Sequence, residues 1–383
     1  MNNEALYQER FARIKKAIAL EPVDQVPVVY MGVAFAPRYM GMSMAKFCAD
    51  PEASLQVNLA AMDRLNGFGG LDGCNLAGGG RIAPQLTTIW LSHIAEPGKE
   101  LPDDSLWQVQ EKEVMTHDDY DAILKDGWGK FMMGYFPRVA DPSNLFPALE
   151  WMGANAMRVA QLYREHGYVT VCDAPVMFTI PFEYLCGGRS MTKFYFDLFR
   201  TPDKVEAVMQ VLLEDFLAQI AAAPSIPGII GATWLGGWRA ASALVSPKLW
   251  DRFVWPYYLK IAEAIIAKGY TPVFHWDQDW SRDLVRLQEM PAKKCILNPD
   301  GMTDMHKFKA LVGDRMAMMG DIPSSLLAAG TPDDVYKFVR DEVELFEGKG
   351  LILCPGCDAP INARPENMEA FVAAAHEFGK VPA

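Results

Sequence analysis

Residues 271–276 read TPVFHW, a short apolar run that Asp277 follows directly. A run of this length with almost no polar interruption is typical of a strand buried on both faces of a parallel sheet. Seven further runs share the pattern, at residues 28–32, 71–75, 169–173, 229–234, 294–298, 316–321 and 351–355. The chain therefore predicts eight buried strands.

Amphipathic helical stretches separate these strands, at residues 144–166, 203–222, 247–268, 331–347 and 365–379. Two of them have recognisable starts, because Ser246-Pro247 and Thr331-Pro332 place a capping residue before a proline in the first helical turn. Strands that alternate with helices in this way predict an α/β protein with a (β/α)8 (TIM) barrel, preceded by an N-terminal helix. An open doubly wound sheet is the alternative, but its G-x-G-x-x-G turn is missing after the first strand, where the chain reads GVAF.

Residues 86–114 interrupt the alternation of strands and helices. Two β-rich runs, at residues 87–94 and 107–114, flank a turn rich in proline, glycine and aspartate, and the second run largely alternates polar and apolar residues. We therefore expect a solvent-facing β-hairpin that is inserted in a single barrel domain spanning residues 1–383.

The composition argues against several classes of protein. The chain has 36 basic and 48 acidic side chains and a net charge of −12, which argues against a nucleic-acid partner. Its seven cysteines are odd in number and scattered, so we expect reduced thiols rather than a disulfide framework. The N-terminal stretch lacks the apolar core of a signal peptide, and no window approaches the roughly 18 uninterrupted apolar residues of a membrane span. We expect a cytoplasmic protein with no membrane partner.

The densest group of ionisable residues lies at the end of the apolar run at residues 271–276. Functional groups of a TIM barrel collect at the carboxyl ends of its strands, and His275 and Asp277 are two residues apart and project to the same side. His275 is a candidate acid/base group or metal ligand, with Asp277 as its partner or as a second ligand. Asp279 is a candidate substrate contact. The alternative for either aspartate is the N-cap of a helix that begins near Ser281.

A second group of candidates follows the last strand. Cys354 belongs to the apolar run and is expected to be a small buried side chain, whereas Cys357 lies beyond the next turn, where it can face the barrel mouth. His275, Asp277 and Cys357 together offer three ligand types that zinc accepts, and they leave one position open for a substrate.

Further candidates lie at or just after the other strand ends. Asp321 is a candidate catalytic or substrate-binding acid, and its alternative role is a turn or cap before a helix expected at Ser324. Aromatic side chains and one cation offer flat walls and a charge for an aromatic or carboxylate substrate, although most aromatic residues are expected in the core. The candidate substrate-binding residues, besides Asp279, are Tyr30, Asp173, Trp234, Trp238, Arg239 and Trp276.

Several of these landmarks occur in an order that resembles the uroporphyrinogen decarboxylase superfamily. They are ERF at 9–11, EPVDQVPV at 21–28, His275-x-Asp277, GDIP at 320–323 and GLILCPGC at 350–357. With RPENM at 364–368, they run from the first helix to the last, so the resemblance covers essentially the whole chain. It implies a (β/α)8 barrel with its site at the mouth.

The superfamily has two functional branches. Decarboxylases resemble one another in an arginine-rich N-terminal loop that binds the carboxylates of a porphyrinogen, whereas residues 34–40 of this chain hold a single arginine, Arg38. The other branch contains corrinoid-dependent methyltransferases, whose thiol-methylating members bind zinc through H-x-C and a distant cysteine. This chain matches the histidine and the distant cysteine, but it has Asp277, a harder ligand, in place of the first cysteine.

The resemblance therefore implies a methyltransferase that passes a methyl group from a methylated substrate, expected to be an aromatic methyl ether, to a corrinoid (cobalamin) carried by a partner protein. His275, Asp277 and Asp321 are expected to supply or orient the acid that the departing oxygen needs, with zinc as a second expected cofactor. The alternatives are a zinc-dependent thiol methyltransferase, a decarboxylase of a smaller acid, and a corrinoid-binding barrel without enzymatic activity. A homodimer stays open as the oligomeric state.

Overall fold

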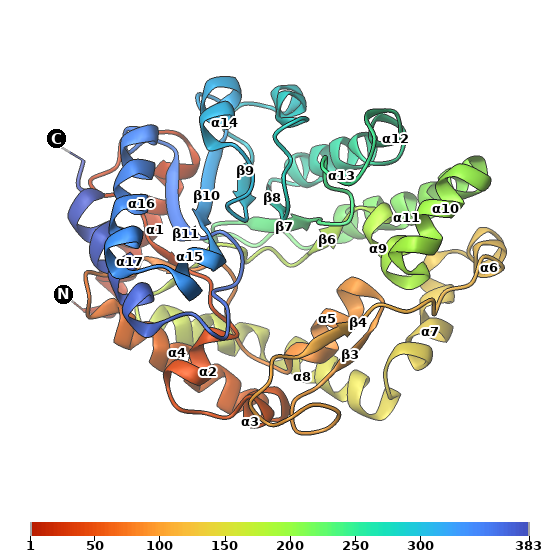
Figure 1. The fold of residues 1–383 in the computed structure, drawn as a ribbon, viewed down its shortest axis with the longest axis horizontal. Helices are drawn as coiled ribbons and strands as arrows, with labels where there is room; N and C mark the ends of the chain where they lie inside the picture. Colours follow the sequence, from red (N-terminus) through yellow and green to blue (C-terminus); the bar gives the residue numbers. More distant parts are fainter. Residues whose placement is uncertain (1, 382–383) are drawn as a thin grey trace.

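The computed structural model describes residues 2–381 and contains two parallel sheets that together form a barrel (Figure 1). The smaller sheet has the order β1-β2-β5, with strands at Val29–Tyr30, Gly73–Cys74 and Val169–Thr170. The larger sheet has the order β11-β10-β9-β8-β7-β6. Its strands are β6 (Phe178–Thr179), β7 (Ala232–Gly236), β8 (Thr271–Trp276), β9 (Ile296–Pro299), β10 (Ala317–Ile322) and β11 (Leu351–Pro355).

Two seams close the sheets into a ring. At the first seam, Val28 bridges Leu353 in parallel and Leu353 N donates to Pro27 O at 2.8 Å, which joins β1 to β11. At the second seam, Ala174 N donates to Ala232 O at 3.1 Å, which joins β5 to β7. The ring is therefore β1-β2-β5-β7-β8-β9-β10-β11, and each of its strands overlaps one predicted run. The predicted (β/α)8 barrel is confirmed, while the assignment of the whole chain to one domain stays a prediction.

Helices lie around the strands, with α16 and α17 beside β11 and with α11 and α13 on the side of β7 and β8 (Figure 1). The α-helices are α1 (Asn3–Ile18), α2 (Phe35–Tyr39), α3 (Met44–Ala49), α4 (Pro51–Asn66), α5 (Ile82–Trp90), α6 (Asp119–Asp126), α7 (Trp128–Val139), α8 (Pro142–Glu165), α9 (Pro181–Arg189), α10 (Met191–Arg200), α11 (Pro202–Ala222), α12 (Pro247–Phe253), α13 (Trp255–Ala267), α14 (Met305–Val312), α15 (Ser324–Ala329), α16 (Pro332–Phe346) and α17 (Pro365–Phe378). A 3-10 helix, η1, spans Leu284–Glu289.

The predicted helices differ from the observed ones mainly where proline intervenes. Residues 247–268 form two helices separated at Val254, because Pro256 has no N–H and its ring disrupts the preceding turn. The predicted cap at Thr331 is confirmed, since its Oγ1 accepts from Asp334 N at 3.3 Å while Asp334 Oδ2 accepts from Thr331 N at 2.9 Å. The side chain of Ser246 makes no capping hydrogen bond within the described residues.

Side chains alternate between the inside and the outside of the barrel, as strand geometry requires. Along β8, Val273 belongs to the apolar cluster that fills the barrel, whereas Phe274 and Trp276 belong to the larger cluster between strands and helices. The inner cluster also contains Ile14 and Ile18 of α1. The N-terminal helix thus closes one end of the barrel, and the carboxyl ends of the strands form the open end.

The inserted hairpin is present, but it is shorter than predicted. Its strands are β3 (His93–Ala95) and β4 (Gln108–Gln110), which pair antiparallel. The strand predicted at residues 87–94 is wrong for its first half, because residues up to Trp90 belong to α5. Ile82, Leu86 and Ile89 recur at helical spacing along α5, and Ala83, Pro84 and Thr87 of the same helix are buried. This tertiary packing outweighs the local preference of threonine and isoleucine for strands.

No helix among residues 2–381 combines the length and the apolar content that crossing a membrane requires.

Candidate functional site

A cavity of about 390 Å³ lies at the carboxyl ends of the strands, where a TIM barrel carries its site. Most of its wall is aromatic or aliphatic, and no lysine or arginine lines it in the part of the chain that the structure describes. One wall comes from α5 and from the loop that precedes β4. The apolar lining residues include Ile82, Leu86, Ile89, Trp90, Leu106, Trp107, Phe178, Tyr184, Trp234 and Trp238.

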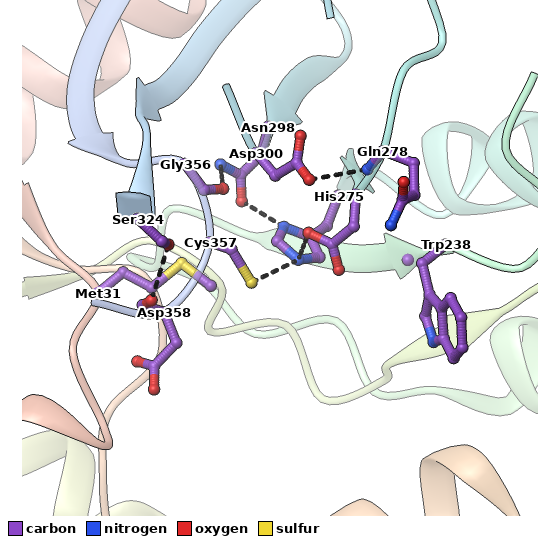
Figure 2. A network of polar contacts seen from close by, with 12 residues as sticks. Met31, Trp238, His275, Gln278, Asn298, Asp300, Ser324, Gly356, Cys357 and Asp358 are labelled. Carbon is purple, nitrogen blue, oxygen red and sulfur yellow. Dashed lines mark hydrogen bonds and ion pairs between the residues drawn. The ribbon is translucent and has the colours of Figure 1, made fainter. Parts of the chain in front are cut away.

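His275, Asp277 and Cys357 all line this cavity, although Cys357 is 82 residues from the histidine in sequence. Figure 2 shows the Cys357 sulfur directed toward the His275 ring. His275 Nε2 lies 3.3 Å from Asp277 Oδ1 and 3.9 Å from Cys357 Sγ. One potential ligand atom from each residue lies within 4.8 Å of the other two. The three predicted metal ligands therefore converge, as expected from strand β8 and the turn that follows β11.

Asn298 fixes the orientation of the histidine ring. Its amide nitrogen donates to Met319 O at 2.5 Å and to Gly356 O at 3.3 Å, so its Oδ1 faces His275 Nδ1 at 2.8 Å (Figure 2). An amide oxygen can only accept, so Nδ1 carries the proton of the neutral ring. The lone pair of Nε2 is then directed toward Asp277 and Cys357.

Trp234 packs against one face of the His275 imidazole. Its indole stacks on His275 with centroids 4.1 Å apart, and its Nε1 donates to Asn75 Oδ1 at 2.9 Å. Asn75 Nδ2 in turn donates to Asn298 Oδ1 at 3.3 Å. Residues from β7, β8, β9 and the end of β2 thus form one connected polar network around the imidazole.

Opposite pKa shifts mark His275 and Asp277 as a charge-coupled pair. Burial disfavours the imidazolium, but the negative charge of the adjacent Asp277 carboxylate outweighs it, so the pKa of His275 is raised. Burial likewise opposes the carboxylate, but His275 and the Cys357 thiol hold the pKa of Asp277 below its ordinary value. Burial and the nearby carboxylates raise the pKa of Cys357 well above its usual range.

Asp358 anchors the turn that carries Cys357. Its carboxylate accepts from Val33 N at 2.5 Å and from Ala34 N at 2.9 Å, which ties the turn after β11 to the start of α2. Burial raises its pKa to about 6 despite these two donors. Ser324 Oγ donates to Asp358 O at 3.3 Å on the other side (Figure 2).

The donor set fits a zinc ion. Zn–N and Zn–O bonds of about 2.0–2.2 Å and Zn–S bonds of about 2.3 Å place tetrahedral ligand atoms roughly 3.3–3.7 Å apart. The two separations from His275 Nε2, 3.3 Å to Asp277 Oδ1 and 3.9 Å to Cys357 Sγ, are close to this range. Asp277 Oδ1 is buried without a hydrogen-bond partner among the described residues, and a cation would satisfy it. Three protein ligands leave the fourth tetrahedral position for water or substrate.

The predicted substrate-binding residues divide into two groups. Tyr30, Trp234 and Trp238 line the cavity. The side chain of Trp276 belongs to the outer cluster, where it stacks on Trp280 with centroids 4.3 Å apart, because it follows His275 directly in an alternating strand. Its side chain is not part of the cavity wall.

Two predicted aspartates have local structural roles instead. Asp173 accepts from Ile230 N at 3.1 Å and from Gly231 N at 2.7 Å, so it reinforces the seam between β5 and β7. Asp279 Oδ1 accepts from Ser281 N at 2.8 Å, which matches its alternative role as a cap. Neither residue lines the cavity.

Asp321 and Arg239 are both buried side chains. Asp321 is 3% exposed, and burial together with the charge of Glu342 in α16 raises its pKa well above its ordinary value. Arg239 is 1% exposed, lies over the Trp238 ring at 4.2 Å, and forms long ion pairs of 3.6 Å with Glu111 and 3.8 Å with Glu183. Neither side chain lines the cavity.

Glu183 is a cavity residue that the sequence did not single out. It lies in the first turn of α9 and is 3% exposed, and its Oε1 accepts from Trp238 N at 3.0 Å and from Ala240 N at 2.8 Å. The sequence feature that could have identified Glu183 is its position as a single acidic residue in the apolar stretch VMFTIPFEYLC at 176–186. Asn75 and Asn298 lie at predicted strand ends, but their roles depend on partners in distant strands.

A family model described as Uroporphyrinogen decarboxylase (URO-D) matches residues 142–378. This segment contains the whole His275–Asp277–Cys357 cluster, whereas α5 and the hairpin lie outside it. Curated proteins described as uroporphyrinogen decarboxylase are also similar, at 28% identity over 201 residues for Psychromonas ingrahamii and 23% over 206 residues for Vibrio cholerae. These alignments cover 50% of this chain and 53% or 54% of the relatives, so the chain spans about half the length of the curated relatives it matches.

A solved structure described as a methyltransferase from Methanosarcina mazei is similar over nearly the whole length of both chains. The TM-score is 0.67 at 19% sequence identity, with 96% of this chain and 98% of the other covered. This likeness supports the same fold for both proteins.

Proposed function

Because the chain belongs to the uroporphyrinogen decarboxylase (URO-D) family and is therefore an enzyme of that superfamily, we propose that it is a corrinoid-dependent methyltransferase. In this proposal it transfers the methyl group of a methylated substrate, an aromatic methyl ether, to a corrinoid carried by a partner protein. The observation that carries the proposal is the position of the His275–Asp277–Cys357 cluster on the wall of an apolar, aromatic cavity.

The reaction breaks the bond between the ether oxygen and the methyl carbon and forms a bond between that carbon and cobalt. The cobalt(I) of the acceptor corrinoid is oxidised to cobalt(III), and the oxygen leaves with its electron pair and takes a proton from solvent. An unassisted alkoxide or phenoxide leaves poorly, so a group that stabilises the oxygen is required. A zinc ion held by His275, Asp277 and Cys357 would supply a Lewis acid at that place.

The residues of the chain contribute position and a dry environment. Trp234 and Trp238 offer flat faces on which an aromatic ring can pack. Asn298 holds the proton of His275 on Nδ1, so that Nε2 stays available as a ligand. The apolar wall from α5 excludes water, which strengthens electrostatic interactions in the cavity.

The cavity wall argues against the decarboxylase alternative for a substrate with many carboxylates. Arginine and lysine are the usual partners of carboxylates, and the described residues that line the cavity include neither. Asp277 argues against the thiol alternative, because a carboxylate leaves zinc less electron-rich than a thiolate does. Both alternatives remain outcomes of the experiment below.

The test is to mix the protein with a cobalt(I) corrinoid and a series of methoxylated aromatics and to follow the absorbance of the methylated corrinoid. We expect methyl transfer with at least one ether, lost in His275→Ala and Cys357→Ala and kept in Cys48→Ala, which removes a buried thiol of α3. Methyl transfer from methylcobalamin to a thiol, with none from any ether, would replace the proposal with the thiol branch. Release of carbon dioxide from an acid without any corrinoid would replace it with a decarboxylase.

A further inference from the structure

Glu183 is the acid on the cavity wall that keeps an unused hydrogen-bond acceptor. Three acidic residues line the cavity, and Asp277 belongs to the cluster with His275, while both oxygens of Asp358 accept backbone N–H groups. The Oε1 of Glu183 also accepts two backbone N–H groups. Its Oε2 has no hydrogen bond among the described residues; the nearest cationic group is Arg239 Nη1 at 3.8 Å.

The backbone holds this carboxyl group in place close to the His275 strand. Trp238 N and Ala240 N fix Oε1 from the loop after β7. Gly237, which precedes Trp238, donates its N–H to His275 O at 2.9 Å. A Cβ at Gly237 would lie 3.1 Å from Glu183 Oε1 and would overlap the Tyr258 hydroxyl, so glycine permits this close approach.

Burial leaves Glu183 only partly ionised near neutral pH. Burial raises its pKa to about 7, although the Arg239 guanidinium and the backbone donors act in the opposite direction. The ionisable groups that face it from the neighbouring elements are Cys186 in α9, Tyr195 in α10, Arg239 after β7 and Tyr258 in α13, with Glu111 of the inserted segment on the far side of Arg239.

We propose that Glu183 Oε2 accepts a hydrogen bond from a hydroxyl group of the substrate, so that the cavity selects methoxylated aromatics that also carry a free phenolic hydroxyl. This inference rests on the proposed function for the methoxylated ring. A buried site that hydrogen-bonds a hydroxyl rejects analogues that lack it, because the polar group of the protein is then left without a partner. Glu183 would thus be a specificity-determining residue.

The inference is tested by equilibrium binding without any corrinoid, followed by the fluorescence of the cavity tryptophans. The probes are 2-methoxyphenol and 1,2-dimethoxybenzene, which differ by one methyl group on the hydroxyl oxygen. We expect the wild type to bind the phenol about tenfold more tightly or better, and Glu183→Gln to lose most of that preference. Glu263→Gln, an exposed acid on α13, is the matched control and should keep it.

The pH dependence of this preference separates hydrogen bonding from packing. An ionised carboxylate is the stronger acceptor, so the preference for the phenol should rise as the pH increases through about 7 in the wild type. In Glu183→Gln it should be flat. Glu183→Asp keeps the charge beside Arg239 but shortens the side chain, and thermal unfolding checks that both variants fold. A preference in Glu183→Gln that equals the wild-type preference, or no preference in the wild type, overturns the inference.

The outcomes also separate the inference from the proposed function. A pH-dependent preference for the phenol with no methyl transfer from any ether supports the hydroxyl contact and contradicts the methyltransferase. Methyl transfer with equal affinity for both probes supports the methyltransferase and overturns the hydroxyl contact. Tighter binding of 2-methoxyaniline than of the phenol would also overturn it, because an amine would then be the donor that Glu183 selects.

Discussion

Among single residues, Asn298 sets the tautomer of His275: it accepts a hydrogen bond from Nδ1 and so leaves Nε2 free to bind a metal. The donors of its amide are both used by backbone carbonyls, so its oxygen must face the imidazole. Partners of this kind, which orient a ligand without touching the metal, have large effects on metal affinity. The proposed metal centre therefore depends on a residue that is not one of its ligands.

Replacing Asn298 with leucine should weaken zinc binding by about 10- to 100-fold, because His275 Nδ1 loses its acceptor and the ring is no longer held. Asn298→Asp keeps an oxygen at this place and should bind zinc more tightly than Asn298→Leu. Competition with a chelator gives the dissociation constants, and thermal unfolding checks the fold of both variants. Equal zinc affinity in the wild type and Asn298→Leu would contradict the orienting role.

The sequence predicted the three cluster residues because His275 and Asp277 lie two residues apart at the end of one strand, and Cys357 follows the turn after another. Side chains of neighbouring strand residues point to opposite faces, so Trp276 lies on the opposite face from His275. The prediction that both residues contact the substrate was inconsistent with this alternation. Glu183 was missed because its importance comes from donors in a loop 55 residues later. A side chain whose role depends on distant partners has no local signal.

Among the elements, the seam between β5 and β7 depends on a carboxylate. Asp173 accepts the N–H groups of Ile230 and Gly231 just before β7 begins, and it is close enough to α1 for Lys15 to lower its pKa. Burial is the larger effect and raises the pKa from 3.8 to about 6. The folded state therefore binds the proton of Asp173 more tightly than the unfolded state does.

This shift predicts a pH-dependent contribution of Asp173 to stability. Protonation favours the folded state, so the contribution is complete below pH 4 and is lost as the pH rises through about 6. Relative to Asp173→Asn, the wild type should lose about 1–3 kcal/mol of unfolding free energy between pH 4 and pH 7. Urea unfolding at a series of pH values measures this difference. A difference that stays constant with pH would contradict the assignment.

Helix α5 forms the apolar wall opposite the strand ends, and it is where the sequence prediction failed. Thr87, Thr88 and Ile89 prefer strands in isolation, but Ile82, Leu86 and Ile89 share one helical face that lines the cavity. The packing of α5 against the rest of the protein, which buries Ala83, Pro84 and Thr87, decided the structure there. The inner strands were predictable because burial on both faces leaves a continuous apolar run in the sequence itself.

A larger side chain on the cavity face of α5 should weaken ligand binding without disturbing the His275–Asp277–Cys357 cluster. Leu86→Phe adds volume on the cavity face of α5 and should lower the affinity for methoxylated aromatics about tenfold or more, with unchanged zinc content. Leu124→Phe, at a 41% exposed position on α6, is the control and should bind like the wild type. Tryptophan fluorescence measures both affinities. Unchanged ligand affinity in Leu86→Phe would show that the ligand lies elsewhere.

The whole molecule is a barrel with one closed and one open end. Ile14 and Ile18 of α1 pack into the cluster that fills the barrel, so access is left at the carboxyl ends of the strands. The cavity, the His275–Asp277–Cys357 cluster and Glu183 all lie at that end. A partner that carries a corrinoid would therefore have to dock over this opening.

The most direct test of the proposed methyl transfer follows the methyl carbon itself. A cobalt(I) corrinoid is mixed with the enzyme and with 2-methoxyphenol labelled with carbon-13 in the methoxy group, and the label is observed by NMR. We expect the label to move from the ether to the corrinoid in amounts equal to the demethylated product, and His275→Ala to reduce this transfer to background. A label that stays on the ether at every enzyme concentration would contradict the proposed methyl transfer.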